Sequence, residues 1–423
     1  MSELINNRER RREALKDIIL QLHQGRDPQE LKAQFHQLLQ TAGATEIAEL
    51  ETELIAAGLP EEEVRRLCDV HVAIFEDALE AQAQPETVPG HPVHTFRLEN
   101  EAAAQVVEEA RQDLRRLGAA GGDYVQAEAP LRDLREHLLQ LRELDKHYTR
   151  KENLLFPYLE KYGIKGPSAV MWGLHDEIRA GLKEVLSILD DAGSYTLESQ
   201  VDALRSRLNP LLEMITSMFQ KEDNILFPMS LERLSEEEWL AIHRESPDIG
   251  FALVEPGDEW PIDLDRLTAE QERAPARAEP APKEDGLIRL ETGVLSGREL
   301  NLLLKHLPVD ITFVDKDDRV RYFSAGRDRI FVRTEAVIGR AVQNCHPPSS
   351  VHIVNRILGD FKSGRRDDAE FWINFEGRLV HIRYFAVRDE EGEYAGTLEV
   401  TQDVTAIREL EGERRLLSEA EAA

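Results

Sequence analysis

Hydrophobic residues recur every three or four positions in four stretches between residues 90 and 233, and each stretch predicts an amphipathic helix. The second and fourth stretches end in similar phrases, HYTRKENLLFPYLE (His147 to Glu160) and MFQKEDNILFPMS (Met218 to Ser230), which indicates an internal repeat. The apolar stripes consist of Phe96, Ala103, Val107, Ala110 and Leu114; Leu144 and Leu155; Met171, Ile178, Leu182, Leu186 and Leu189; and Leu204, Leu208, Leu211, Ile215, Phe219, Leu226 and Met229.

Several polar residues, together with Met218, fall inside or beside these apolar stripes. A carboxylate buried there must be paired, protonated or bound to a cation. His and Glu side chains that converge from facing helices form the iron, manganese and zinc sites of four-helix bundles. The alternative is that each residue is simply hydrogen-bonded in the core. The residues inside or beside the stripes are Asn100 in the first stretch, His147, Lys151 and Glu152 in the second, His175 in the third, and Met218 and Glu222 in the fourth.

The phrases HYTRKENLLFPYLE and EDNILFP resemble the His-xxx-Glu…LFP signatures of hemerythrin-like (HHE) cation-binding domains. The resemblance implies a four-helix bundle that holds non-haem iron, usually as a di-iron centre. The imidazole ligands it implies are His147, His175 and, from the first helix, His91 or His94; the carboxylate ligands, terminal or bridging, are Glu222 and Glu152.

The sequence departs from the family's pattern at two ligand positions, and at a third if Asn100, rather than His91 or His94, stands at the histidine position of the first helix. Lys151 stands at the glutamate position of the second helix, and Met218 stands at the histidine position of the fourth. A cation beside a metal lowers metal affinity, so one alternative is that Lys151 pairs with Glu222 and replaces a metal. A second alternative is haem b, because Met218 and His175 offer the thioether and imidazole that bind haem iron in some proteins.

From residue 300 to residue 408 the pattern changes to short runs of alternating apolar and polar residues, which predict five strands with small helices between them. This layout, closing with QDVTAIRELE, resembles a PAS sensor domain. The phrase NCHPPSS places Cys345 and His346 before two prolines in a stiff loop. Either side chain could bind haem iron axially, which is a third alternative for the cofactor.

The words LCDVHVAIF, GHPVHTF and the LFP repeat together resemble a bacterial family with three domains. Its members join an uncharacterised helical N-terminal domain to a hemerythrin-like domain and a C-terminal PAS domain. We therefore expect a multidomain chain: an all-α N-terminal part at residues 1–86, a four-helix bundle at 87–234, a helix and disordered linker at 235–286, and an α+β PAS domain with a C-terminal helix at 287–423.

Charge and composition narrow the function. The formal net charge of -29 argues against a nucleic-acid-binding surface. No apolar run approaches the roughly 20 residues of a membrane span, and the polar N-terminus does not have the pattern of a signal peptide. We therefore expect a cytoplasmic protein that binds neither nucleic acid nor membrane.

These features favour a sensor rather than an enzyme. A mono- or di-iron site and the PAS domain would respond to oxygen, nitric oxide, redox state or iron. The signal would pass to a protein partner, and a homodimer could form through the PAS domain or the C-terminal helix. The alternatives are a haem sensor, or a non-haem iron enzyme or iron donor in nitrosative or oxidative stress repair. A reductase needs electrons, and the sequence has no G-x-G-x-x-G loop of the kind that binds flavin or nicotinamide nucleotides.

Overall fold

The computed structural model describes residues 87–191, 195–260, 287–326 and 329–411, together with scattered positions between residues 13 and 31. The chain forms two compact units, one helical and one built around a sheet, and each is described by itself. Three parts of the expected layout lie outside the described residues: most of the helical domain at 1–86, residues 261–286 of the helix and linker at 235–286, and the C-terminal helix beyond residue 411. None of the described helices combines the length and apolar character that crossing a membrane requires.

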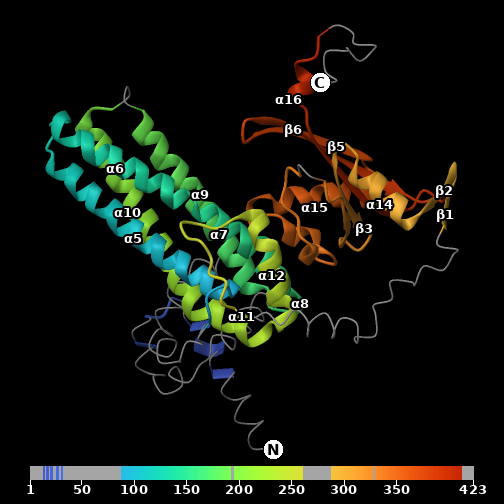
Figure 1. Ribbon diagram of the computed structural model, residues 1–423, viewed down its shortest axis with the longest axis horizontal. Helices are drawn as coiled ribbons and strands as arrows, with labels where there is room; N and C mark the ends of the chain where they lie inside the picture. The colour runs from blue at the N-terminus through green and yellow to red at the C-terminus, as the bar shows by residue number, and fades with distance from the viewer. Residues whose placement is uncertain are drawn as a thin grey trace, which may run out of the picture. The chain divides into compact units, whose positions relative to one another are not determined.

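Four long helices form the helical unit: α5 (Pro92–Ala119), α6 (Tyr124–Arg142), α9 (Gly166–Asp190) and α10 (Leu197–Lys221). Neighbouring helices contact each other in the order α5, α6, α9, α10 and back to α5, and Figure 1 shows them side by side. The apolar stripes are buried where the helices face one another. The predicted four-helix bundle is confirmed.

Shorter helical segments extend the second and fourth long helices. α7 (Leu144–Arg150), η1 (Lys151–Leu155) and α8 (Phe156–Lys161) follow α6, while η2 (Glu222–Leu226) and α11 (Phe227–Arg233) follow α10. The last helix of the unit, α12 (Glu236–Ile249), begins with a capping box. The Ser235 side chain accepts the backbone N–H of Glu238, and the Glu238 carboxylate accepts the backbone N–H of Ser235.

Both copies of the repeated phrase contain a π-helical turn. The turn η1 covers KENLL and η2 covers EDNIL, and a Phe-Pro pair follows each. Proline has no N–H to donate to the preceding turn, so the α-helical bonding pattern is interrupted there. A π turn accommodates an extra residue, and two consecutive side chains can then face inwards. Lys151 and Glu152 are both buried, and so are Lys221 and Glu222.

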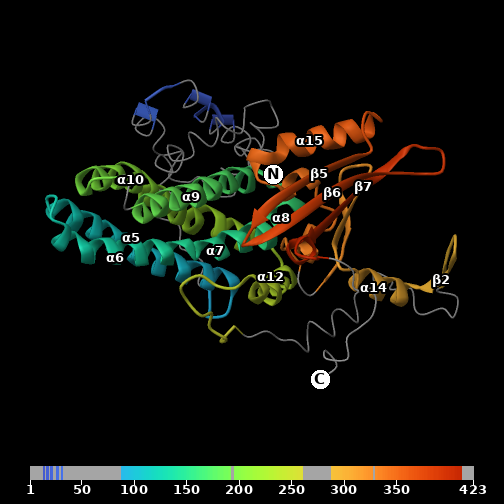
Figure 2. The ribbon, with the colours of Figure 1, turned by 90° about the horizontal axis from the view of Figure 1, so that it is seen from above.

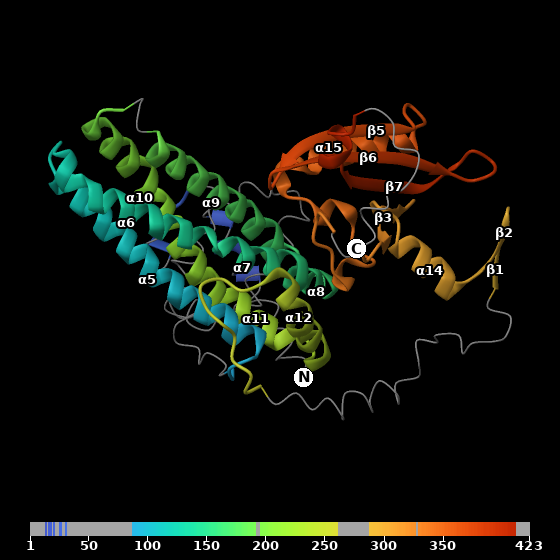
Figure 3. The same cartoon turned by 45° about the horizontal axis from the view of Figure 1, so that its top comes forward.

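The second unit is built around one antiparallel sheet with the strand order β4-β3-β7-β6-β5. Figure 3 shows β5, β6 and β7 side by side. The five strands confirm the predicted α+β layout of this part of the chain. Their bounds are β3 (Asp310–Asp315), β4 (Val320–Phe323), β5 (Asp368–Phe375), β6 (Arg378–Arg388) and β7 (Tyr394–Asp403).

Short helices pack against the sheet around a small apolar core. The helix α15 (Pro348–Lys362) lies along the strands (Figure 2), and the 3-10 turns η3 (Glu335–Val337) and η4 (Val342–Cys345) precede it. The core consists of Val314, Val320, Val337, Val342 and Leu358. A hairpin of β1 (Leu287–Leu290) and β2 (Gly293–Ser296) and the helix α14 (Gly297–Lys305) come before the sheet in the chain.

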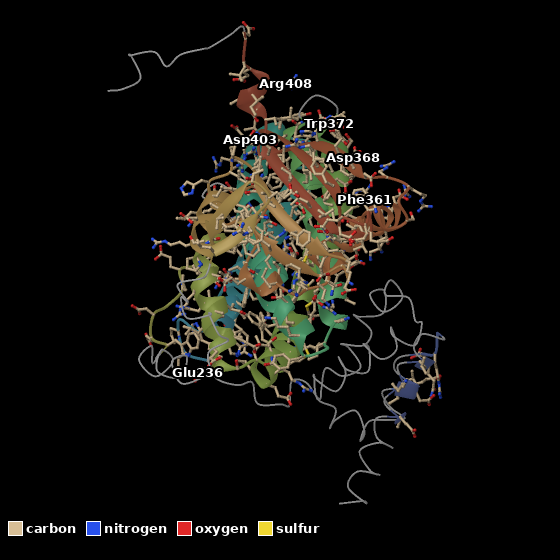
Figure 4. The ribbon with its side chains drawn as sticks, turned by 90° about the vertical axis from the view of Figure 1, so that its right-hand side faces the viewer. Glu236, Phe361, Asp368, Trp372, Asp403 and Arg408 are labelled. Atoms are coloured by element: carbon tan, nitrogen blue, oxygen red, sulfur yellow. The ribbon has the colours of Figure 1, made fainter. Side chains whose placement is uncertain are left out.

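The strand ends of the sheet lie close to the last described helix. Trp372 on β5 and Asp403 at the end of β7 lie near the same end of the sheet, with Arg408 of α16 (Thr405–Arg408) beyond them (Figure 4). Trp372 is 67% exposed and does not belong to the core. The last strand, β7, ends at Asp403, and α16 begins two residues later at Thr405.

Replacing Gly396 on β7 with alanine should destabilise the sheet. A Cβ atom there would lie 2.4 Å from the Val314 carbonyl oxygen and 2.8 Å from the Phe313 ring, so the paired strands would have to separate. We expect a loss of about 1–3 kcal/mol in the free energy of unfolding. The control is Gly359→Ala in α15, where a Cβ meets nothing within 4 Å and a gain of up to about 1 kcal/mol is expected. Urea unfolding followed by circular dichroism measures both; equal stability of the two variants would contradict the prediction.

Candidate functional site

Four of the predicted metal ligands meet in the interior of the helical bundle. His147 on α7, Glu152 on η1, His175 on α9 and Glu222 on η2 are all buried, with exposed fractions of 4% or less. Each lies in or beside an apolar stripe, and the stripes turn inwards when the helices pack. Lys151 is also fully buried beside them.

Glu222 accepts hydrogen bonds from three helical segments. Its Oε2 accepts from Nδ2 of Asn100 at 3.0 Å and lies 2.9 Å from Nε2 of His147, while its Oε1 accepts from Nζ of Lys151. Nδ1 of His147 lies 2.8 Å from Oε2 of Glu99. The ring therefore faces a carboxylate with each nitrogen, and it can donate to both only as an imidazolium.

Lys151 connects Glu222 to the second histidine. Its Nζ lies 3.0 Å from Nε2 of His175, which can only accept from an ammonium group. The proton of His175 is therefore on Nδ1, which donates to Oε1 of Glu152 at 2.8 Å. Because imidazole binds metals through a nitrogen lone pair, the available ligand atom of His175 is already occupied by Lys151.

An arginine side chain lies at each end of this series of hydrogen bonds. Arg179, one turn beyond His175, donates to both oxygens of Glu152 at 2.8 and 3.1 Å. Arg150 donates to Glu99, which also accepts the backbone N–H of Ala252 at 2.6 Å. We call the connected set the core network. It runs through Arg150, Glu99, His147, Glu222, Lys151, His175, Glu152 and Arg179.

Aromatic rings enclose the core network. Tyr148 stacks on His175 with 4.2 Å between ring centroids and 7° between planes, and Nζ of Lys151 lies 4.8 Å from the Tyr148 centroid. Phe96 meets His147 edge-on at 5.0 Å. These rings exclude water, and charged groups interact more strongly where water is excluded.

The pKa values of Glu222 and Glu152 shift in opposite directions, because the cations beside Glu222 outweigh the effect of burial and the cation beside Glu152 does not. Burial acts to raise the pKa of Glu222, but Lys151 and His147 outweigh it and lower the pKa to about 2. For Glu152 burial prevails over Arg179 and raises the pKa to about 7. Burial, with Lys151 next in effect, lowers the pKa of His175 well below its usual value. Glu222 is thus ionised and His175 neutral at pH 7.

The two histidines expected on the first helix do not join the core network. His91 is the N-cap of α5, where its Nδ1 accepts the backbone N–H of Val93 at 3.1 Å. Its ring packs against Trp239 and Trp260, with centroids 5.0 and 4.8 Å away. Nδ1 of His94 is buried and has no hydrogen-bond partner among the described residues. Asn100 provides the contact from α5 to Glu222 instead.

Of the residues expected to bind haem, Met218 and His175 belong to the helical unit, and Cys345 and His346 belong to the sheet unit. Met218 is fully buried on α10, one turn before Glu222. Cys345 packs against the apolar core of the sheet unit, with its Sγ 3.8 Å from the Ala341 carbonyl oxygen, as a small hydrophobic residue does. His346 lines a different feature, an internal cavity of the sheet unit.

This cavity has a volume of about 240 Å³ and lies between α15 and the inner face of the sheet. Its walls are mainly apolar, from residues such as Ile353, Phe371 and Ile382. Polar groups reach it from His346 and Glu399. Drug-sized ligand sites span roughly 300–1,000 Å³. The volume of this cavity therefore favours a ligand smaller than haem.

Three members of the core network were not predicted from the sequence. Arg179 follows His175 by four positions, so the helical period could have placed both on one face. Glu99 and Arg150 pair across 51 positions of sequence and lie on different helices. Nothing in the local pattern distinguishes such a pair from two exposed charges.

Three family models match separate parts of the chain. Residues 91–230 match the hemerythrin HHE cation binding domain, residues 300–405 match the PAS domain, and residues 15–81 match a family of unknown function (DUF438). No curated protein matches the chain.

Several solved structures are similar to the C-terminal part. A C-terminal domain from Streptococcus mutans shares 37% identity over 30% of this chain and 97% of its own, with a TM-score of 0.29. A sensory box sensor histidine kinase from Vibrio cholerae shares 17% identity over 25% of this chain and 89% of its own, with a TM-score of 0.21. The PAS domain of BvgS from Bordetella pertussis shares 20% identity over 25% of this chain and 84% of its own, with a TM-score of 0.22.

The hemerythrin match suggests that the bundle binds metal cations, typically iron. The donor set does not fit a two-iron centre. Such a centre needs carboxylates from facing helices and free imidazole nitrogens. Here both nitrogens of His147, Nε2 of His175 and both oxygens of Glu222 already have protein partners. Among the described residues, no three or more His, Cys, Asp or Glu side chains form a group that could hold a metal ion.

If His91 is a helix cap rather than a ligand, asparagine should replace it at little cost. His91→Asn retains an acceptor for the Val93 N–H and should change the free energy of unfolding by less than about 0.5 kcal/mol, whereas His91→Ala should cost about 1 kcal/mol. Urea unfolding followed by tryptophan fluorescence measures both variants; Trp239 and Trp260, which pack against His91, contribute the signal from this end of the bundle. An equal loss for both variants would contradict the capping role.

The same variants test a pH effect. Burial, with His243 next in effect, lowers the pKa of His91 from 6.5 to about 4. The unfolded chain therefore binds a proton more readily than the folded chain between these values, and stability falls as the pH decreases from 6.5 towards 4. In His91→Asn, the loss of stability that comes from protonation of His91 in the unfolded chain should disappear. An unfolding series from pH 7 to pH 4 measures it, and an unchanged pH dependence in the variant would contradict the assignment.

Proposed function

We propose that this chain, which joins a DUF438 region, a hemerythrin HHE domain and a C-terminal PAS domain, is a sensory protein whose input is a small molecule held in the PAS cavity. The hemerythrin and PAS matches support a sensory protein. The observation that carries the finer proposal is the mainly apolar cavity with a buried carboxylate in its wall.

The charge of Glu399 indicates the chemistry of the ligand. Its side chain is only 8% exposed, and its Oε1 accepts one long hydrogen bond, 3.3 Å, from the Thr401 hydroxyl. Its Oε2 has no hydrogen-bond partner among the described residues. A buried carboxylate oxygen gains most from a cationic donor. We propose that the ligand is a small amine with an apolar body.

His346 and Tyr384 complete the polar end of the cavity. Burial, with Arg333 next in effect, lowers the pKa of His346 to about 4, so the ring is neutral at pH 7 and does not repel a cation. Burial and Glu399 both raise the pKa of Tyr384, which therefore remains a phenol. The apolar wall, which includes Ile353 and Phe371, would hold the body of the ligand.

The signal would leave through the end of the sheet. The strand β7 carries Glu399 in the cavity wall and leads directly into α16. A ligand bound at Glu399 is thus one short strand segment from the last described helix. We propose that this end contacts a protein partner, or a second copy of the chain through the PAS domain or the C-terminal helix.

A second candidate function is sensing of oxygen, nitric oxide, redox state or iron by a single iron in the bundle. The hemerythrin match favours it, together with the convergence of His147, His175, Glu152 and Glu222. It requires Lys151 to leave its position beside Glu222. Iron-dependent absorption that changes when oxygen or nitric oxide is added would support this candidate, and a featureless spectrum with iron present would count against it.

The amine proposal is tested with benzylamine, benzyl alcohol and benzoate, which differ only in the charge and donors of the polar end. We expect the full chain to bind benzylamine most tightly and benzoate not at all. Glu399→Gln should weaken benzylamine at least about 10-fold, because a hydrogen bond to a charged group contributes roughly 1.5–3 kcal/mol. Binding of benzyl alcohol should change little. Isothermal titration calorimetry measures all three.

The matched control is Glu370→Gln, which removes a carboxylate from β5 that is exposed and bonded to His381 rather than directed into the cavity. It should leave benzylamine binding unchanged. Equal loss in both variants, or tighter binding of benzoate than of benzylamine, would rule out recognition by Glu399.

A further inference from the structure

We propose that the ammonium group of Lys151 takes the place of a metal ion in the bundle, so that this hemerythrin-type bundle folds and functions without a metal. This inference concerns the helical unit and does not depend on the ligand proposed for the PAS cavity. The structure assigns Lys151 this role through its contacts, through the charge balance around it and through the helix geometry that places it.

The contacts of Lys151 are those that a metal ion would make. Its Nζ touches Oε1 of Glu222, and it lies 3.0 Å from Nε2 of His175. One is a carboxylate oxygen and the other an imidazole lone pair, the two donor types that hold iron in helical bundles. The Tyr148 ring, 4.8 Å from Nζ, adds a cation–π contact. A metal bound to Glu222 would lie beside this positive charge and be repelled by it.

Every buried carboxylate in the core network has a protein cation beside it, so none of them depends on a metal for compensation. A divalent ion added to the same groups would bring two uncompensated positive charges into a region from which aromatic rings exclude water. Only the release of protons from the core network could offset them. Three buried carboxylates each bond one cationic side chain: Glu99 bonds Arg150, Glu222 bonds Lys151 and Glu152 bonds Arg179. His147 lies between Glu99 and Glu222.

The π turn η1 makes this arrangement possible. It buries Lys151 and Glu152, which are adjacent in sequence, and lets each reach a different partner. Lys151 binds Glu222, and Glu152 binds His175 and Arg179. The position of Lys151 is therefore built into the fold rather than being a chance approach of a long side chain.

The test exchanges the charge at this one position. The full chain and its Lys151→Glu variant are titrated with Co²⁺ alone and, without oxygen, with Fe²⁺ alone. The wild type should take up neither stoichiometrically. In Lys151→Glu the new carboxylate joins Glu222 and His175, and we expect a visible Co²⁺ ligand-field band and affinity at least about 100-fold above the wild type, since even the outer partners of metal ligands change affinity 10- to 100-fold.

Lys151→Met provides a second test, which measures the melting temperature and needs no metal. It leaves Glu222 buried beside a thioether, and the melting temperature of the bundle should fall by about 10 °C. The control is Lys146→Met, which removes a lysine paired with Glu143 at the surface and should shift the melting temperature by about 2 °C or less. EDTA should not change the melting temperature of the wild type.

Stoichiometric uptake of Co²⁺ or Fe²⁺ by the wild type, with a rise in its melting temperature, would overturn the proposal. So would a folded Lys151→Glu variant with no gain in Co²⁺ affinity. If Lys151→Glu does not fold, the wild-type titration and the two methionine variants still decide. The proposal is supported if the wild type takes up no Co²⁺ or Fe²⁺ and only Lys151→Met shows a large fall in melting temperature. Equal small falls in melting temperature in Lys151→Met and Lys146→Met overturn it.

Discussion

Burial of charge within a four-helix bundle is the constraint on which the helical unit depends. An ionised group removed from water is stable only if a partner of opposite charge and enough hydrogen bonds replace the solvent. Glu222 has such partners on three other segments, and the register of the helices must hold all of them at once. Removal of Lys151 would leave the buried charge of Glu222 without its ion-pair partner. The core network therefore constrains the relative positions of α5, α7, α9 and η2 in addition to apolar packing.

The two units show opposite ways of treating a buried carboxylate. In the bundle, Glu222 is saturated by protein donors and enclosed by aromatic rings, which leaves nothing for a ligand to replace. In the sheet unit, Glu399 faces a cavity and accepts only one long hydrogen bond. This contrast supports our proposals that the PAS domain binds the ligand and that Lys151 takes the place of a metal ion in the bundle. On these proposals, the hemerythrin match reflects the fold of the helical unit.

The sequence pattern was sufficient for the four helices and the five strands, because helical and strand periods are local features. Periodicity alone placed His147 and Glu152 on opposite sides of their stripe. The resemblance to hemerythrin-like domains grouped them with His175 and Glu222 and identified Lys151 as a departure at a ligand position. The pattern could not decide whether Lys151 pairs with Glu222, because their contact depends on two π turns that the periodicity does not reveal. The roles of Glu99 and Arg150 were missed for a related reason, since each is an ordinary helical charge until a distant segment packs against it.

The most direct test of this account is the iron content of the full chain, purified from cells grown with ample iron, together with its ultraviolet–visible spectrum. A bundle whose cation is Lys151 predicts iron far below one atom per chain, no Soret band and no iron charge-transfer absorption. One or two iron atoms retained per chain would contradict it and return the metal-sensing function to the helical unit.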